Sequence, residues 1–500
     1  MNAVNLYILC QGLALEDFND YRKALTDSYN KNQEKKEEMK SLQCLVTELL
    51  EAGVEIAGMD DFFYGFSIPQ ISKEFDLLKI YEDGPVVNIE LKSQEIEIGR
   101  IQYQLEKNRY YLAHLNKKIY SFTYVENGEK GDVYTYDGEK LSRCELEDVI
   151  AVLNANEGRT CVQKNIEKMF RAKDYLVSPV NTPDRFVDGR YYLTGQQEAI
   201  KKEILNSIDE GEHVLWGIQG GAGTGKTLLL YDIAKSLAAD RRVCVIHSGI
   251  LSHGHNVLNR RMNNVNIIPA KECCDVRLDS YDCILVDESQ RLYQRDFDCI
   301  IRAFQKNGKH CMFSYDYYQV LSYAEQDRNI PEQLHQLDAF CERKLSEKIR
   351  TNIEITSFIK NVIDLSNKPK RHMDYGNIEV LYAEDYNVAA QIVDYYTSDK
   401  GYEFISYTPS NVRSKLDKFN GYVNTHHVIG QEFDNVLFSM DRNFRYSDKG
   451  HLQGLAHPNP DYIFYKLWYQ GVSRARERLC ILIIGNEPLF DSIIKVRMQV

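Results

Sequence analysis

The sequence predicts an α/β protein, and three observations support this. A glycine-rich run, Gly220–Thr227, lies between an apolar segment typical of a buried strand and a segment, Leu228–Ala239, typical of a helix. A second apolar segment ends in the acidic pair Asp287 and Glu288. Far upstream, apolar segments flank the turn Glu82–Pro85, which predicts a β-hairpin. Buried strands that alternate with helices are typical of parallel sheets, so we expect more than one α/β domain.

The length of 500 residues is enough for about two to four domains. The chain is 43% hydrophobic and 27% charged, which is ordinary for globular proteins. No apolar run approaches the ~18 residues of a membrane span, and no signal-peptide pattern is present, so we expect a cytoplasmic protein without a membrane partner. The net charge of −12 argues against a uniformly basic surface but is compatible with a local basic groove.

The cysteines form no C-x-x-C pair, although the chain has 12 of them. Cys273 and Cys274 are adjacent, and no histidine lies at ligand spacing from them. We therefore expect reduced thiols in the protein core, with a zinc site or disulfides as the minor alternative.

The glycine-rich run has the sequence GGAGTGKT and fits the pattern G-x-x-x-x-G-K-[ST]. Gly220, Gly223 and Gly225 would let backbone N–H groups approach phosphate oxygens, and the following helix would add its positive end. Lys226 would reach the β- and γ-phosphates of ATP, and Thr227 would hold Mg²⁺. An ordinary glycine turn is the alternative, but the strand and helix on either side favour an ATP site.

A phosphate-binding loop requires acidic residues at the end of a neighbouring strand, and the sequence contains such a pair. Asp287 and Glu288 end the apolar segment 281–286, and Asp287 comes 60 residues after Thr227. Asp287 would hold Mg²⁺ through water, and Glu288 would orient or deprotonate the attacking water. Two acids alone are a weak signal, and their position at the end of a buried strand strengthens it.

The predicted N-terminal hairpin carries a second set of charged residues. Asp76 lies on its first strand, and Glu90 and Lys92 lie on its second. Glu90 and Lys92 are two residues apart and so share one face of the strand, which Asp76 can meet across the hairpin. The carboxylates would hold Mg²⁺ or Mn²⁺, and the lysine would position or polarise a water beside a phosphate. The alternative is an amphipathic hairpin whose charged face meets water.

This pattern resembles the PD-(D/E)xK nuclease family, which has a restriction-endonuclease-like fold. The resemblance covers roughly residues 40–150 and implies metal binding by Asp76 and Glu90, with Lys92 as a catalytic residue. The family often adds an upstream glutamate, and a glutamine and a tyrosine on the next helix near DNA. The candidates here are Glu48 or Glu51, and then Gln102, Gln104, Tyr110 and Tyr111.

The rest of the chain resembles superfamily 1 helicases, and most closely the Schlafen group 3-like DNA/RNA helicase domain. The resemblance implies a core of two RecA-like lobes that bind and hydrolyse ATP. It rests on short segments in family order. They are residues 192–200, 220–227, 281–290, 313–319, 345–352, 425–434 and 471–476.

Several roles are implied by this resemblance alone. Gln196 or Gln197 would bind adenine, because a glutamine amide can pair with both N6 and N7. Gln319 would sense the γ-phosphate, and Arg350 would contact it. The ordinary alternative for Gln319 is a turn residue, and for Arg350 it is a surface ion pair worth ~1 kcal/mol or less. The order of the segments favours the helicase roles.

The last two segments add an acid and an arginine. Glu432 is implied as a nucleotide-facing acid. Arg474 is implied as the arginine finger, which neutralises charge on the γ-phosphoryl group and is worth roughly 10³-fold or more in rate. The segment before Gly430 is one residue shorter than the commonest helicase form, which leaves the roles of His426 and His427 open.

The spacing of the segments predicts the domain organisation. We expect a nuclease-like domain with N-terminal helices at 1–172, a linker at 173–190, and motor lobes at 191–335 and 336–500. The short spacings between the segments leave no room for large insertions between the motor lobes. This favours a compact motor that translocates, remodels or gates the nuclease.

The clearest basic cluster offers either a phosphate-backbone contact or a solvated loop. It comprises Lys368, Lys370, Arg371 and His372.

The combined prediction is an ATP-dependent nuclease–helicase that acts on DNA more than on RNA, with single strands at the motor. Such fusions resemble bacterial anti-phage defence or restriction components. One alternative is a nucleic-acid-stimulated ATPase or translocase whose N-terminal domain is a non-catalytic binding or partner-docking module. Another is an ATP-driven switch that senses a protein partner. The acidic net charge leaves room for a partner protein or a second copy of the chain.

Overall fold

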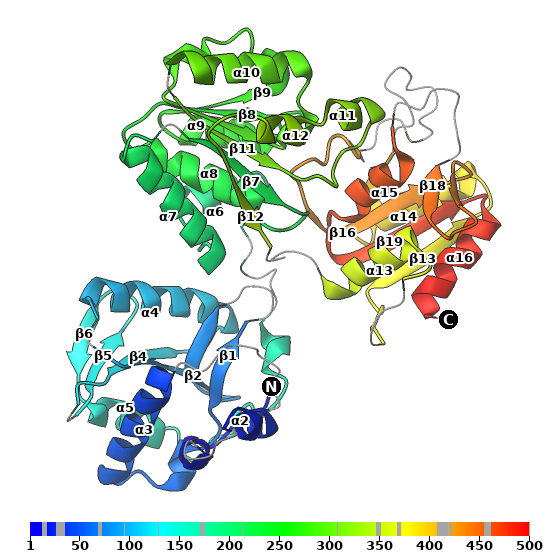
Figure 1. Cartoon of the computed structure of the whole chain (residues 1–500). Coiled ribbons are helices and arrows are strands. Elements are labelled where there is room, and N and C mark those ends of the chain that lie inside the picture. The colour runs from blue at the N-terminus through cyan, green and yellow to red at the C-terminus, as the bar shows by residue number, and fades with distance from the viewer. Residues whose placement is uncertain are drawn as a thin grey trace. The chain divides into compact units, whose positions relative to one another are not determined.

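The chain forms two compact units, Met1–Tyr175 and Leu176–Val500 (Figure 1). The computed structural model describes residues 1–12, 18–26, 36–68, 73–94, 96–128, 130–170, 175, 177–212, 214–307, 309–346, 352–367, 372–407, 419, 423–454 and 462–499. Among these residues, no helix combines the length and apolar character needed to cross a bilayer.

The N-terminal unit is built on a six-stranded sheet in the order β1-β2-β3-β4-β5-β6. The strands are β1 Phe63–Ser67, β2 Glu74–Ile80, β3 Val86–Lys92, β4 Ile119–Val125, β5 Asp132–Tyr136 and β6 Leu141–Cys144. Neighbours are antiparallel except β3 and β4, which are parallel and joined by α4 Ile98–Leu112. The other helices are α1 Leu6–Gln11, α2 Phe18–Thr26, α3 Lys36–Glu51 and α5 Leu146–Asn154.

The central strand β3 is buried from Val86 to Leu91 because helices cover both faces of the sheet. On one face, Leu45 and Leu49 of α3 pack in the same core as Ile89 and Leu91. On the other face, α4 packs against β4 and β5. Side chains alternate along a strand, so Glu90 points away from the α3 core and toward α4.

The C-terminal unit begins with a six-stranded parallel sheet in the order β12-β7-β11-β10-β8-β9, here called the first lobe. Its strands are β7 Leu215–Gly220, β8 Val243–His247, β9 Val265–Pro269, β10 Cys283–Asp287, β11 His310–Tyr315 and β12 Phe340–Leu345. Its helices are α6 Pro183–Val187, α7 Gly195–Asp209, α8 Lys226–Leu237, α9 His253–Arg261, α10 Gln294–Asn307, α11 Tyr323–Arg328 and α12 Ile330–His335. Helices α7, α8 and α9 contribute to one core, and α10 and α12 to another.

Two predicted boundaries differ from this arrangement. Strand β12 pairs with β7, so the boundary predicted between residues 335 and 336 falls before the first sheet is complete. Part of the predicted linker 173–190 belongs to the same lobe, because Val177 and Phe186 are buried in its core. Both corrections come from long-range packing, which the local sequence pattern does not reveal.

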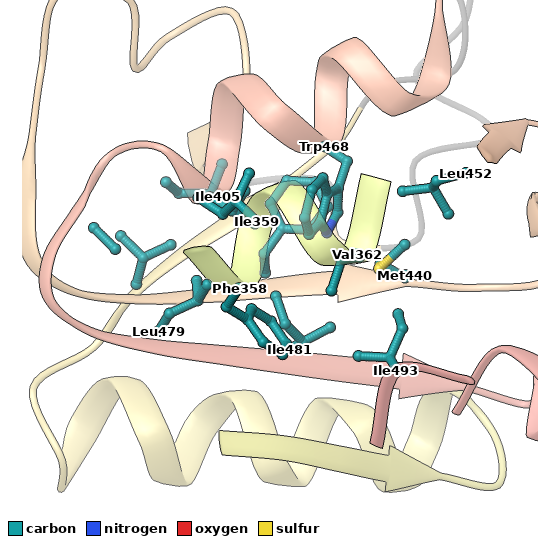
Figure 2. Packing of buried hydrophobic residues seen from close by; sticks show 14 of the residues in the cluster. Phe358, Ile359, Val362, Ile405, Met440, Leu452, Trp468, Leu479, Ile481 and Ile493 are labelled. Atoms are coloured by element: carbon teal, nitrogen blue, oxygen red, sulfur yellow. The ribbon is translucent and has the colours of Figure 1, made fainter. Parts of the chain in front are cut away.

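The second lobe is a five-stranded parallel sheet in the order β13-β19-β16-β14-β15. Its strands are β13 Ile378–Ala383, β14 Glu403–Ser406, β15 Val423–Asn424, β16 Phe433–Met440 and β19 Ala475–Ile484, beside a hairpin of β17 Phe444–Tyr446 and β18 Leu452–Gly454. Its helices are α13 Ile353–Ile363, α14 Tyr386–Ser398, α15 Phe464–Val472 and α16 Glu487–Met498. Figure 2 shows Trp468 of α15 in one core with Phe358 of α13 and Ile481 of β19.

Candidate functional site

The glycine-rich loop follows β7 and leads directly into α8. Gly223 and Gly225 have φ values of +75° and +81°, which favour glycine. A Cβ on Gly220 would lie 2.5 Å from Thr224 Oγ1, so this position has no room for a larger residue. Lys226 Nζ donates to the carbonyl of Gly221 at 3.1 Å, which folds the lysine back over the loop. The predicted strand, loop and helix therefore occur in the order that phosphate binding needs.

Thr227 at the start of α8 contacts Asp287 at the end of β10. Thr227 Oγ1 donates to Asp287 Oδ2 at 3.1 Å, and Ser314 Oγ donates to Asp287 Oδ1 at 2.6 Å. Burial opposes the charge on Asp287, but His247, Ser314 and Lys226 outweigh it and hold the pKa of this carboxyl below its usual value. An ionised carboxylate beside a hydroxyl fits the oxygen ligands that Mg²⁺ prefers.

Glu288 follows in the left-handed region, with a φ of +57°. For a residue other than glycine, this conformation costs roughly 1 to 3 kcal/mol and is common at functional sites. Gln290 Nε2 donates to Glu288 Oε2 at 2.6 Å, and Gln290 Oε1 accepts from the backbone N–H of Asp316 at 3.2 Å. Gln290 thus orients the carboxylate of Glu288. The sequence pattern does not reveal this role, although Gln290 lies only two residues after the acidic pair.

A buried series of polar side chains joins the two lobes. Lys226 Nζ lies 4.0 Å from Asp316 Oδ2, and Gln319 Nε2 donates to the same oxygen at 3.0 Å. From the second lobe, Arg474 Nη2 donates to Gln319 Oε1 at 3.1 Å. Burial raises the pKa of Asp316, and the charge of Lys226 opposes that effect. Predicted residues more than 200 positions apart therefore lie in one connected cluster.

Glu432 forms an ion pair with Arg476 of the same lobe. Its Oε2 accepts a hydrogen bond from Arg476 Nε at 3.1 Å, and Arg476 Nη2 lies 3.1 Å from the same oxygen as an ion pair. Arg476 also lies 3.9 Å from Asp434 Oδ1. The acid is thus part of an ion pair within the second lobe. A nucleotide-facing role for Glu432 remains a prediction.

The two glutamines proposed to bind adenine are both engaged within the chain. Gln197 Oε1 accepts from the backbone N–H of Thr194, and its Nε2 lies 3.3 Å from the carbonyl of Thr224 in the glycine-rich loop. Gln196 is half-buried, and its Nε2 donates to the carbonyl of Lys344 at 2.9 Å. Gln197 therefore braces the loop, while Gln196 contacts the end of β12.

His426 is half-buried and packs against Tyr462, with ring centroids 4.6 Å apart. Burial, helped by the nearby charges of Arg291 and His427, lowers the pKa of His426 to about 3. The ring is thus neutral at ordinary pH. Arg350 and three members of the basic cluster lie outside the described residues. These three are Lys368, Lys370 and Arg371.

The charged residues of the N-terminal hairpin meet on one face of the sheet. The register pairs Leu77 with Ile89, which places Asp76 opposite Glu90. Asp76 Oδ2 accepts from the backbone N–H of Leu91 at 2.8 Å. Lys92 lies two residues beyond Glu90 on the same face. Strand pairing therefore brings all three predicted residues together.

Helix α4 supplies polar partners for the fully buried Glu90. Asn108 Nδ2 donates to Glu90 Oε1 at 2.6 Å, and Gln104 donates to the other oxygen. Burial favours the neutral acid, but the charges of Lys73 and Lys92 and the amides of Asn88 and Asn108 outweigh burial and lower the pKa of Glu90. Gln104 was predicted to lie near DNA, and here it contacts the acid.

Lys73 is a residue that the sequence analysis missed. Its side chain is half-buried, and desolvation lowers its pKa, whereas the charges of Glu90 and Asp76 oppose that effect. Its position three residues before Asp76 was the available signal. Glu48, by contrast, accepts from the hydroxyl of Tyr124 at 2.6 Å on the α3 side of the sheet, away from Glu90. The upstream glutamate role has no support at this position.

Residues 213–401 match the family model of the Schlafen group 3, DNA/RNA helicase domain. Among solved structures, the chain is similar to the Pif1 helicase from Candida albicans at 14% identity, with 62% of this chain and 100% of that chain covered and a TM-score of 0.32. It is also similar to a Pif1 helicase from Bacteroides in complex with ADP-AlF3 and ssDNA, at 12% identity, 56% and 91% coverage and a TM-score of 0.32. None of the curated proteins compared with the chain matches it. The family match includes the glycine-rich loop and Gln319 and ends before Glu432 and Arg474.

Proposed function

We propose that residues 176–500 form an ATP-driven helicase or translocase that acts on single-stranded nucleic acid. The observation that carries the proposal is the buried series from Lys226 through Asp316 and Gln319 to Arg474. It connects the glycine-rich loop of one lobe to an arginine of the other. The match of residues 213–401 to a DNA/RNA helicase domain supports the same function.

The side chains around the loop divide the work of hydrolysis. ATP with Mg²⁺ supplies the γ-phosphoryl group and a cation that neutralises part of its charge. Thr227 and Asp287 would hold the cation, and Lys226 would contact the phosphates. Glu288, oriented by Gln290, would position the attacking water. Arg474 would stabilise the charge that develops on the transferred group.

The two lobes give ATP hydrolysis a mechanical consequence. Gln319 of the first lobe accepts from Arg474 of the second, so this contact depends on the distance between the lobes. A phosphate that attracts the guanidinium would compete with Gln319 for it, and the two lobes would shift relative to each other. Repeated binding and hydrolysis would thus move the lobes along a bound strand.

The experiment that tests the motor is ATP hydrolysis with and without single-stranded DNA or RNA. Lys226→Ala should abolish hydrolysis, and Glu288→Gln should reduce it strongly while ATP still binds. The matched control is Lys202→Ala, which removes an exposed lysine of α7 in the same lobe. Hydrolysis by Lys226→Ala at the rate of the control would refute the assignment. An equal rate of ATP hydrolysis with and without nucleic acid would favour a switch that senses a protein partner.

We also propose that the N-terminal unit is a metal-dependent nuclease, acting on DNA more than on RNA. The observation that carries this is the cross-strand pair of Asp76 and Glu90, with Lys92 on the same face. Carboxylate oxygens at this spacing suit Mg²⁺ or Mn²⁺, and the lysine could polarise an attacking water. A motor fused to a nuclease would suit anti-phage defence or restriction. A phage challenge tests this role in bacteria that express either the wild-type chain or Lys226→Ala.

Mn²⁺ titration distinguishes a nuclease from a docking module. The wild-type chain should bind Mn²⁺ more tightly than Asp76→Ala and Glu90→Gln, and both variants should lose cutting. Glu157→Gln, at an exposed position of the same unit, is the matched control and should behave as wild type. Equal Mn²⁺ affinity in all four proteins would favour the non-catalytic binding or docking module.

A further inference from the structure

Three cysteines and an aspartate gather on the first lobe, away from the residues assigned to ATP. Cys273 and Cys274 follow the short helical turn Ala270–Glu272 after β9, and Asp296 and Cys299 lie on α10. The ligand atoms of Cys273, Cys274 and Asp296 all lie within 4.8 Å of one another. The thiol of Cys299 interacts with that of Cys274. The fold thus unites residues from two separate segments.

The partners of Asp296 are unusual for a buried carboxylate. Asp296 is only 4% exposed, and Cys274 Sγ lies 3.9 Å from its Oδ1. A thiol is a weak hydrogen-bond donor, and buried carboxylates are normally paired with strong donors or with cations. Cys273 is fully buried, and its Sγ lies 3.8 Å from the carbonyl of Asp296. Among the described residues, the hydrogen-bond partner of this carboxylate is thus a thiol, and the cation near it is Arg295.

We propose that Cys273, Cys274, Cys299 and Asp296 bind one Zn²⁺ ion. Tetrahedral zinc with Zn–S bonds of about 2.3 Å places its sulfur ligands about 3.8 Å apart. The ligand atoms of Cys273, Cys274 and Asp296, which lie within 4.8 Å of one another, need to approach by about 1 Å to reach that geometry, and Cys299 would complete the set. Asp296 and Cys299 are three residues apart on a helix, so they share one face and can bind the same ion.

The charges around the cluster fit such an ion. Binding converts the three thiols to thiolates and releases their protons to solvent, while the carboxylate binds in its ionised form. Three thiolates and a carboxylate exceed the charge of Zn²⁺ by two negative charges. Arg295 interacts with Cys274, and Arg302 interacts with Cys299, so two guanidinium groups offset that excess. Partners of this kind commonly orient and tune metal ligands.

The consequence for the fold is a link between two segments at the border of the first lobe. Strand β9 is at the edge of the parallel sheet, and the turn after it carries Cys273 and Cys274. Helix α10 covers the face of the sheet that contains Ile284 and Phe313. An ion held by both segments would fasten the edge of the sheet to this helix. Its role would be structural, because all four ligand positions are taken by protein.

Metal analysis of the full-length chain, purified in reductant, tests the proposal. We expect roughly one zinc per chain, and replacement by Co²⁺ should produce the thiolate-to-cobalt absorption of a tetrahedral sulfur site. Cys274→Ser and Cys299→Ser should each lose most of the metal and the absorption. Cys341→Ser is the matched control, because Cys341 is a half-buried thiol of the same lobe outside the cluster, and it should keep the metal.

Three results would overturn the zinc site. The first is a folded, reduced wild-type chain that binds neither Zn²⁺ nor Co²⁺. The second is full retention of the metal by both Cys274→Ser and Cys299→Ser. The third is a metal-free chain in which mass spectrometry finds a disulfide within the cluster, which would assign these thiols to redox chemistry instead. If a variant fails to fold, the metal content and the cobalt spectrum of the wild type still decide the question.

Discussion

At the scale of single residues, Arg474 is the contact through which the second lobe reaches the glycine-rich loop. It is 6% exposed, and its Nε donates to the carbonyl of Gln470 at 3.1 Å. Its Nη2 donates to Gln319, which in turn donates to Asp316. A buried guanidinium with several fixed acceptors is oriented in advance, which is what stabilisation of a transition state requires.

Replacing Arg474 with alanine should lower kcat for ATP hydrolysis by roughly 10³-fold. The KM for ATP should change little, because the interaction strengthens only as charge develops on the γ-phosphoryl group. Arg474→Lys should recover little activity, since lysine lacks the planar fork of donors. Steady-state kinetics check this, with the exposed Arg445→Ala of β17 as the control. A wild-type kcat in Arg474→Ala would exclude the finger role.

His255 couples the stability of the first lobe to pH. Its Nδ1 accepts from the backbone N–H of Ser252 at 3.0 Å, which requires a neutral acceptor nitrogen. Burial and the neighbouring His247 lower the pKa of His255 to about 3, against a smaller opposing effect of Asp287. Between pH 6.5 and 3 the unfolded chain therefore binds a proton that the folded chain does not. Stability is lost as the pH falls through this window.

His255→Gln should make stability less sensitive to acid. Glutamine at this position keeps an acceptor for the capping box that begins at Ser252, but it does not titrate. From pH 7 to pH 5 the wild-type chain should lose about 2 kcal/mol through this histidine, and the variant should not. Urea unfolding at the two pH values measures the difference. Equal losses in the two proteins would show that His255 protonates in the folded state.

At the scale of elements, Gln197 links the start of α7 to the glycine-rich loop. The helix begins after Thr194, whose hydroxyl and backbone form a capping box with Gln197. The free end of the amide approaches the carbonyls of Thr224 and Gly225 at 3.3 and 3.4 Å. One buried side chain thus holds both the helix start and the shape of the loop.

Gln197→Leu should lower thermal stability and weaken ATP binding, because it leaves buried backbone groups without partners at roughly 1 to 3 kcal/mol each. Gln196→Leu, at the neighbouring half-buried position, should lower stability less, because it loses only hydrogen bonds near the surface at the end of β12. It should reduce the preference for ATP over GTP if Gln196 binds adenine. Thermal unfolding and nucleotide titrations of both variants separate the two roles. If Gln196→Leu alone lost stability, the roles assigned to the two glutamines would have to be exchanged.

The elements show which features the sequence could predict. The hairpin of β2 and β3 and the parallel strands β7, β8 and β10 are confirmed, because each depends on a local apolar pattern and a turn. Strand β12 was missed as part of the first sheet. Its pairing with β7 links residues more than a hundred positions apart, and no local pattern records that contact.

The residues of the candidate sites also divide into those that the local sequence reveals and those that only long-range contacts reveal. Motif residues such as Lys226, Thr227 and Asp287 could be named from their order in the sequence. Their partners, such as Lys73 and Gln290, could not, because each acts through packing between separate elements. The cysteine cluster is of this second kind, since two segments some twenty residues apart form it.

At the scale of the whole molecule, the chain combines two units with separate charged centres. The unit Met1–Tyr175 carries the cross-strand carboxylates, and the unit Leu176–Val500 carries the glycine-rich loop. If both centres are active, hydrolysis of ATP by one unit should change cutting by the other. Neither centre alone would produce that dependence.

The most direct test is cutting of circular single-stranded DNA, linear duplex DNA and RNA, with Mg²⁺ or Mn²⁺ and with or without ATP. The wild-type chain should cut DNA, and ATP should alter its rate or pattern of cutting. Lys92→Ala should not cut but should still hydrolyse ATP, while Lys226→Ala should cut in a way that ATP no longer alters. ATP hydrolysis without any cutting under all of these conditions would contradict the nuclease–motor assignment and favour the docking module.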